Sequence, residues 1–103
     1  MTGCPVERIV LIKLTESAAT PDSRQAVAAE TRRVFPTIPG VKSIHVAQAD
    51  AADQGSWDLC LKVGFDHVDD VPGYRSHPIH VAYVDEYLKP KLDCLKAWNF
   101  VSV

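Results

Sequence analysis

The segment ERIVLIKL, residues 7–14, is apolar on both of its faces. Its β-branched residues and short length predict a β-strand, in which successive side chains point to opposite sides of the sheet. Three apolar side chains then lie on one face and two on the other: Val10, Ile12 and Leu14 against Ile9 and Leu11. A strand that hides both faces belongs inside a layered structure, so this segment predicts a covering layer on each side of its sheet.

Three later segments also have strand patterns. Residues 41–49 alternate between apolar and polar positions, and residues 57–65 do so most clearly, with Trp57, Leu59, Leu61, Val63 and Phe65 on one side. The polar stretch 50–56 between these two segments favours a β-hairpin. Residues 94–103 are expected to close the chain as a fourth strand, in which Leu95, Ala97 and Val101 oppose Trp98 and Phe100.

Two helical regions separate the strands. Residues 20–35 are predicted to form a helix with Thr20 as its N-cap and Pro21 at its first position. Its inward face is expected to hold Ala26, Val27, Thr31, Val34 and Phe35. Residues 66–77 predict a short or irregular helical segment, because Pro72 and Gly73 weaken its interior. A second helix is expected from Pro78 to about Lys89, before Pro90 stops it.

The order βα, ββ, αβ predicts a single α+β domain over residues 1–103. We expect a ferredoxin-like protomer whose four-stranded antiparallel sheet carries helices on one face. The other face would then expose an apolar set that water tolerates poorly: Ile9, Leu11, Cys60, Trp98 and Phe100. A second copy of the chain would cover this face, so the sequence predicts a homodimer.

Composition excludes several classes of partner. The chain has 103 residues, 47% of them hydrophobic, and its 11 basic and 13 acidic residues give a net charge of −2. Without a basic stripe, neither nucleic acid nor an anionic membrane is expected as a partner. The three cysteines, Cys4, Cys60 and Cys94, have no Cys-x-x-Cys spacing, which argues against disulfides and zinc. No signal-peptide or membrane-span pattern is present, and a cytoplasmic location is expected.

The stretch YRSHPIH, residues 74–80, carries the candidate chemistry. Pro78 pushes the residue before it out of helical geometry, so His77 is expected to flank or cap the helix. His80 falls in the first helical turn, where the helix dipole disfavours a charged imidazole and leaves a neutral base. Tyr74 could donate a hydrogen bond to a developing oxyanion. A packing role for Tyr74 and backbone hydrogen bonding by both histidines explain the pattern equally well. The sequence has no His-x-x-x-His pair or acidic triad that would give a recognised set of metal ligands.

Four segments together resemble one family over nearly the whole chain: RIVLIKL, IPGV, WDLCLKVGF and above all YRSHPIH. The chain is similar to the stress-responsive dimeric α/β-barrel (Dabb) proteins. The resemblance implies two ferredoxin-like protomers whose sheets pair into a barrel, with a pocket between sheet and helices in each. The catalytic tyrosine and histidine of a plant polyketide cyclase in this family match Tyr74 and His80. Leu59 and Arg8 stand where that enzyme has pocket histidines.

Two functional classes follow from this resemblance. The first is a dimer that binds a small apolar ligand or contributes to stress tolerance. The second is a cofactor-independent enzyme, cyclase-like or lyase-like, that acts on an apolar carbonyl compound through Tyr74 and His80. Some monooxygenases share the dimeric ferredoxin-like architecture, but this likeness is one of fold alone and does not predict the same activity. No cofactor or metal is expected in either class. The pocket is expected to be lined by Arg8, Val10, Ile12, Leu59, Leu61 and His77.

Overall fold

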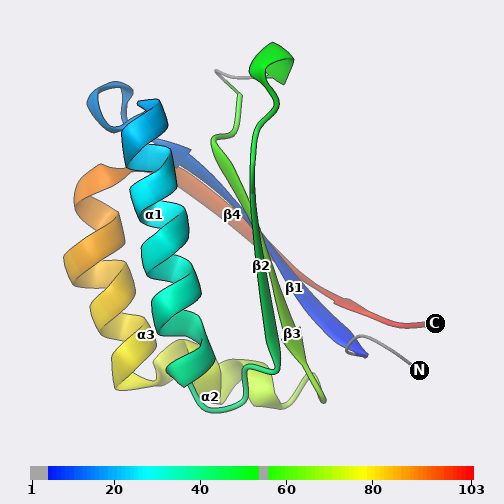
Figure 1. The fold of residues 1–103 in the computed structure, drawn as a ribbon. Coiled ribbons are helices and arrows are strands. Elements are labelled where there is room, and N and C mark those ends of the chain that lie inside the picture. Colours follow the sequence, from blue (N-terminus) through cyan, green and yellow to red (C-terminus); the bar gives the residue numbers. More distant parts are fainter. Residues whose placement is uncertain (1–4, 54–55) are drawn as a thin grey trace.

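The computed structural model describes residues 5–53 and 56–103, so Cys4 and the middle of the predicted polar turn lie outside the described residues. Four strands form one antiparallel sheet in the order β2-β3-β1-β4. They are β1 (Val6–Leu14), β2 (Ser43–Gln48), β3 (Leu59–Phe65) and β4 (Leu92–Val101). Helices α1 (Pro21–Val34) and α3 (Pro78–Ala82) lie side by side on one face of the sheet, and α2 (Asp70–Ser76) precedes α3 (Figure 1). The predicted ferredoxin-like order βαββαβ is confirmed.

The strand registers confirm the predicted faces of the sheet. Val10 pairs with Leu61 on one side and with Ala97 on the other, so these three residues share the helix-facing side. Ile9 pairs with Trp98 on the opposite face. β2 and β3 form the predicted hairpin, in which Val46 pairs with Leu61.

Two strand boundaries differ from the prediction. β3 begins at Leu59, next to Asp58, which is buried and ion-paired with Arg24. Trp57, which was predicted as the first inward residue of this strand, therefore lies outside it. β4 begins at Leu92 rather than Cys94, and its pairing with β1 shifts register between Lys13 and Leu14.

Helix α1 begins as its sequence predicts. The Thr20 side chain accepts a hydrogen bond from the Ser23 backbone N–H, and Pro21 occupies the first turn. The buried face differs at three positions: Ala26 is exposed, whereas Arg24 and Ala28 are buried. The buried carboxylate of Asp58 compensates the Arg24 charge, a long-range pairing that helical periodicity cannot reveal. After α1, Gly40 adopts a φ of 95°, a left-handed conformation that favours glycine, in the turn that leads into β2.

The second helical region continues beyond α3 in a different form. Tyr83–Leu88 is a π-helical segment, and Lys89–Lys91 forms a 3-10 turn that contains Pro90. The predicted helix from Pro78 to about Lys89 is thus one continuous helical run, which changes from an α-helix to a π-helix at Tyr83. Such π-helical segments are frequent at functional sites. Within the part of the chain that the structure describes, no helix is both long and apolar enough to cross a membrane.

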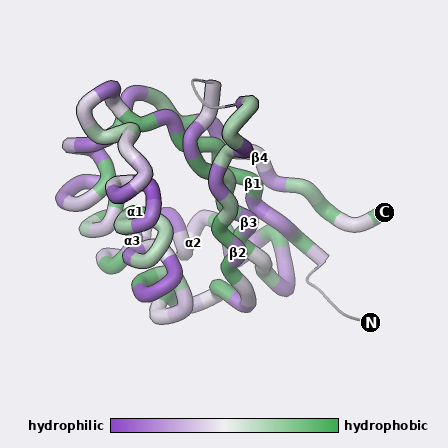
Figure 2. The backbone as a smooth tube through the Cα atoms, turned by 45° about the horizontal axis from the view of Figure 1, so that its top comes forward, coloured by the Kyte–Doolittle hydropathy of each residue, from purple (hydrophilic) through white to green (hydrophobic). Residues whose placement is uncertain are grey.

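The core lies between the sheet and the helices. Its fully buried side chains include Ile12, Leu59, Leu61, Val63 and Phe65 from the sheet, and Val27 from α1. Along the chain, green hydrophobic stretches in the strands and in the helices are interrupted by purple hydrophilic residues (Figure 2). No described element covers the other face of the sheet (Figure 1). On that face Trp98 is 45% exposed and Phe100 is 57% exposed, both high values for aromatic side chains.

Candidate functional site

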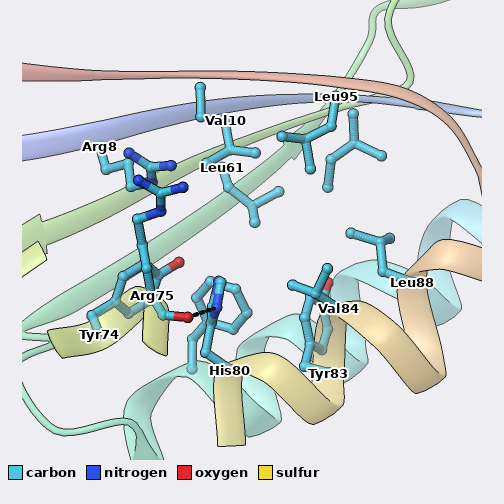
Figure 3. Close-up of a pocket in the computed structure, with 13 residues that line it drawn as sticks. Arg8, Val10, Leu61, Tyr74, Arg75, His80, Tyr83, Val84, Leu88 and Leu95 are labelled. Carbon is cyan, nitrogen blue, oxygen red and sulfur yellow. Dashed lines mark hydrogen bonds between the residues drawn. The ribbon is translucent and has the colours of Figure 1, made fainter. Parts of the chain in front are cut away.

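A cavity of about 170 Å³ lies between the helix-facing side of the sheet and the α2–α3 region (Figure 3). Val10, Leu61 and Ala97 form its floor, where β1, β3 and β4 run next to one another. Residues of the π-helical segment face this floor: Tyr83, Val84 and Leu88. Most of the lining is therefore apolar, as in typical small-molecule sites.

Tyr74 and His80 stand together at one end of the cavity. Their rings are 4.4 Å apart between centroids, although Tyr74 belongs to α2 and His80 to α3. His77 ends α2 with extended backbone geometry, and its Nδ1 accepts a hydrogen bond from the Ile79 N–H at 3.1 Å. Pro78 then begins α3, which brings His80 into its first turn and back toward Tyr74. The predicted capping role of His77 is confirmed.

The hydrogen bond of His80 defines its tautomer. Its Nδ1 lies 3.0 Å from the backbone oxygen of Arg75, and a carbonyl oxygen can only accept. Nδ1 therefore carries the proton, and the lone pair is on Nε2, to which no described residue donates a hydrogen bond. Burial lowers the pKa of His80, while its bond to the Arg75 carbonyl acts in the opposite direction and the charges of Arg8 and Arg75 lower it further. Near neutral pH the ring is an uncharged base.

The Tyr74 hydroxyl is a donor. The side chain is 2% exposed, and burial raises the pKa of Tyr74 far above its ordinary value, although the nearby charge of Arg8 opposes this shift. Among the described residues none forms a hydrogen bond with this hydroxyl, which points into the cavity (Figure 3). Tyr83 differs, because its hydroxyl bonds to Thr31 Oγ1.

Aromatic packing fixes both tyrosines. The Phe35 ring meets Tyr74 edge to face at 6.0 Å and Tyr83 at 5.0 Å, and Phe65 contacts Tyr74 from the sheet at 5.0 Å. Such pairs add stability beyond the area they bury. The Tyr74 hydroxyl is therefore held in place by a rigid ring, which is a requirement for an oriented hydrogen-bond donor.

Two arginines complete this end of the cavity. Arg8 on β1 is half-buried, and its Nη1 donates to Asn99 Oδ1 at 2.9 Å. Burial lowers the pKa of Arg8, and the charge of Arg75 acts in the same direction, against the influence of Tyr74. Arg75 is an exposed residue at the end of α2 and also lines the cavity. The cavity thus has a polar, cationic end and an apolar end.

The model of one protein family, the stress responsive A/B barrel domain (Dabb), matches residues 6–102. The chain belongs to the Dabb family. A search of curated proteins finds no match.

Solved structures share the Dabb fold at low sequence identity. A Dabb protein with a ferredoxin-like fold from Mesorhizobium loti has a TM-score of 0.78 and 15% identity, over 95% of this chain and 96% of that one. A dimeric ferredoxin-like protein of unknown function from Bacteroides fragilis has a TM-score of 0.74 and 24% identity, over 94% and 95%. The hydroxynitrile lyase of Passiflora edulis has a TM-score of 0.76 and 14% identity, over 95% and 93%.

The structure of this Dabb domain brings six of the eight candidate site residues to one cavity: Arg8, Val10, Ile12, Leu61, Tyr74 and His80. Two others lie elsewhere. Leu59 is buried next to a groove between α1 and β2, because it lies two residues before Leu61, at the start of β3. The Nδ1 of His77 bonds to the backbone of α3, and the residue does not line the cavity.

Sequence reasoning missed several residues that line this cavity: Phe35, Arg75, Tyr83, Val84, Leu88, Leu95 and Ala97. A signal existed for Tyr83, which follows His80 by three residues and so shares its helix face. Leu95 and Ala97 were assigned to one face of the last strand without being connected to the pocket. Nothing in the sequence places Arg75 beside Arg8. Within residues 5–53 and 56–103, no cluster of three or more His, Cys, Asp or Glu side chains could hold a metal.

Proposed function

We propose that the protein binds a small molecule with an apolar body in the cavity between sheet and helices, and that it acts as a homodimer. The observation that carries this proposal is the cavity itself, an apolar chamber with hydrogen-bonding groups at one end only. A preformed apolar pocket with a few convergent polar groups is the usual form of a ligand site. A thermal-shift screen with small carbonyl compounds and polyketides tests it, since a ligand that binds the folded state raises Tm.

The sheet face that no described helix covers supports the homodimer. Ile9 and Leu11 are half-buried there, beside the exposed rings of Trp98 and Phe100. A contiguous apolar patch on one sheet is well suited to an isologous interface, in which the same residues meet across a two-fold axis. The Bacteroides fragilis relative is described as dimeric, which supports the same arrangement here.

Light scattering at micromolar concentration is expected to give twice the chain mass of 11.3 kDa. Trp98→Lys is expected to weaken the dimer by about 100-fold or more, because a buried tryptophan is a typical interface hot spot and the change occurs in both copies. Val81→Lys is the matched control, since Val81 is an apolar residue of α3 with a similar exposure of 41%. A wild-type monomer, or equal effects of the two changes, would contradict this interface.

Carbonyl chemistry is the second candidate function. The observation that favours it is the pairing of a protonated Tyr74 hydroxyl with a neutral His80 ring at one end of the cavity. The imidazole can accept a proton from a carbon next to a carbonyl or from a hydroxyl, while the tyrosine stabilises negative charge on the carbonyl oxygen. The Passiflora edulis relative is a hydroxynitrile lyase, which supports testing cleavage or condensation at a carbonyl carbon.

For a turned-over carbonyl substrate, Tyr74→Phe and His80→Ala are each expected to lower kcat by about 100-fold or more. His77→Ala is the control histidine, and it is expected to lower stability without this loss in kcat. The wild-type rate should fall at acid pH only below 6.5, the ordinary histidine pKa, because the base is lost as pH drops through the lowered pKa of His80. If the protein only binds its ligand, the Tyr74 and His80 changes should weaken affinity by about 1 kcal/mol, one hydrogen bond.

A further inference from the structure

Arg8 and Arg75 present two positive charges at one end of an otherwise apolar cavity. They come from different elements, β1 and α2, and both line the cavity. Their guanidinium groups lie next to each other above Tyr74, whereas Leu88 and Leu95 lie at the far end, beyond Leu61 (Figure 3). The cavity is therefore amphipathic along its length.

No carboxylate neutralises this pair. All 13 Asp and Glu residues lie in the described part of the chain, yet none lines the cavity or forms an ion pair with Arg8 or Arg75. Arg24 and Arg33, in contrast, each pair with a carboxylate, Asp58 and Glu30 respectively. Two neighbouring cations at a partly buried wall repel each other, and an anion between them would relieve this repulsion.

The arrangement of Arg8 is suited to such an anion. Its bond to Asn99 Oδ1 fixes the guanidinium group but occupies only one of the five N–H donors of that group. Its partial burial removes water that would otherwise solvate the charge. A guanidinium fork matches the two oxygens of a carboxylate, and charge-assisted bonds of this kind are stronger than neutral ones.

We infer that the natural ligand or substrate is an apolar carboxylate, whose anionic group binds Arg8 and Arg75 while its hydrocarbon part contacts Leu61 and Leu95. This inference rests on the proposed function of the cavity as a ligand site. It also orients the molecule: the group bonded to the carboxylate lies beside the Tyr74 hydroxyl and His80.

The test is a set of matched probe pairs measured by isothermal titration calorimetry. Each pair has the same hydrocarbon body with either a carboxylate or an uncharged carboxamide: benzoate, cinnamate and octanoate against benzamide, cinnamamide and octanamide. At least one carboxylate is expected to bind about 10-fold more tightly than its amide, the effect of a charge-assisted hydrogen bond. Arg8→Met and Arg75→Met are each expected to remove most of this preference, and Arg33→Met, which alters an exposed ion pair, should retain it.

The outcomes separate this inference from the proposed function. If probes bind but the amides bind as tightly as the carboxylates, the carboxylate inference is wrong and the ligand site stands. If the preference for carboxylates over amides persists in both arginine variants, the carboxylate inference is also wrong and the ligand site again stands. If no probe of either form binds, both proposals are overturned. Arg75 is exposed, so the Arg75→Met variant is expected to fold normally even if the Arg8→Met variant does not. Circular dichroism of both variants checks that each is folded.

Discussion

Arg24→Met is expected to lower the free energy of unfolding by about 3–5 kcal/mol, because it leaves the buried Asp58 carboxylate without its ion pair. Arg24 Nε lies 3.1 Å from Asp58 Oδ1, and the two side chains are only 8% and 3% exposed. The second oxygen of Asp58 accepts a hydrogen bond from the Leu14 N–H at 2.7 Å. Asp58 therefore links the end of β1 to α1. Without Arg24 the link to α1 is lost, and the buried carboxylate keeps a charge that no cation compensates.

Urea unfolding at a fixed protein concentration measures this change, since dimerisation makes apparent stability depend on concentration. Arg33→Met is the matched control. The Arg33 side chain is 70% exposed in its pair with Glu30, and exposed pairs contribute little to stability. A loss below about 1 kcal/mol for Arg24→Met would mean that water reaches Asp58 in solution.

Leu61→Ala is expected to cost about 2–5 kcal/mol and to change ligand affinity as well. Leu61 is 1% exposed and forms part of the cavity floor. Its truncation removes buried methyl groups and enlarges the chamber, so a probe that contacts the floor loses apolar contacts. Denaturant unfolding measures the first effect and calorimetry with the carboxylate probes measures the second.

Leu59→Ala is the matched control for this change. Leu59 is 2% exposed on the same strand and points to the same side, but it does not line the cavity. Its truncation should cost stability in the same range without altering ligand affinity. Equal effects of the two changes on affinity would contradict the position of the site.

Local patterns were sufficient to predict the order of the elements and the two faces of the sheet. The alternation in residues 57–65 identified Leu59, Leu61, Val63 and Phe65 as buried, and Thr20 and Pro21 marked the start of α1. These features depend on neighbours in the sequence, because strand and helix periods and caps involve residues at most four apart. Two boundaries and part of the buried face of α1 were not predicted, and the burial of Arg24 depends on its ion pair with Asp58, 34 residues away.

The candidate site was predicted only in part for the same reason. YRSHPIH indicated Tyr74 and His80, because Pro78 fixes where α3 begins and hence which histidine lies in its first turn. The sequence also indicated Arg8, Val10, Ile12 and Leu61 as pocket residues, through resemblance to the Dabb family. It gave no reason to connect Arg75 with Arg8, or Tyr83 with Thr31, since these pairs come from elements far apart in the chain.

The sequence by itself thus determined the order of elements, the two apolar faces of the sheet and the position of the tyrosine–histidine motif. Each of these depends on short-range spacing and on the burial of apolar surface. The tertiary structure alone decided the shape of the cavity, the π-helical wall that faces its floor, and the pair of unneutralised guanidinium groups at its end. Those features arise because packing brings β1, α2 and the helical run after α3 together, and no local preference specifies the distances between them.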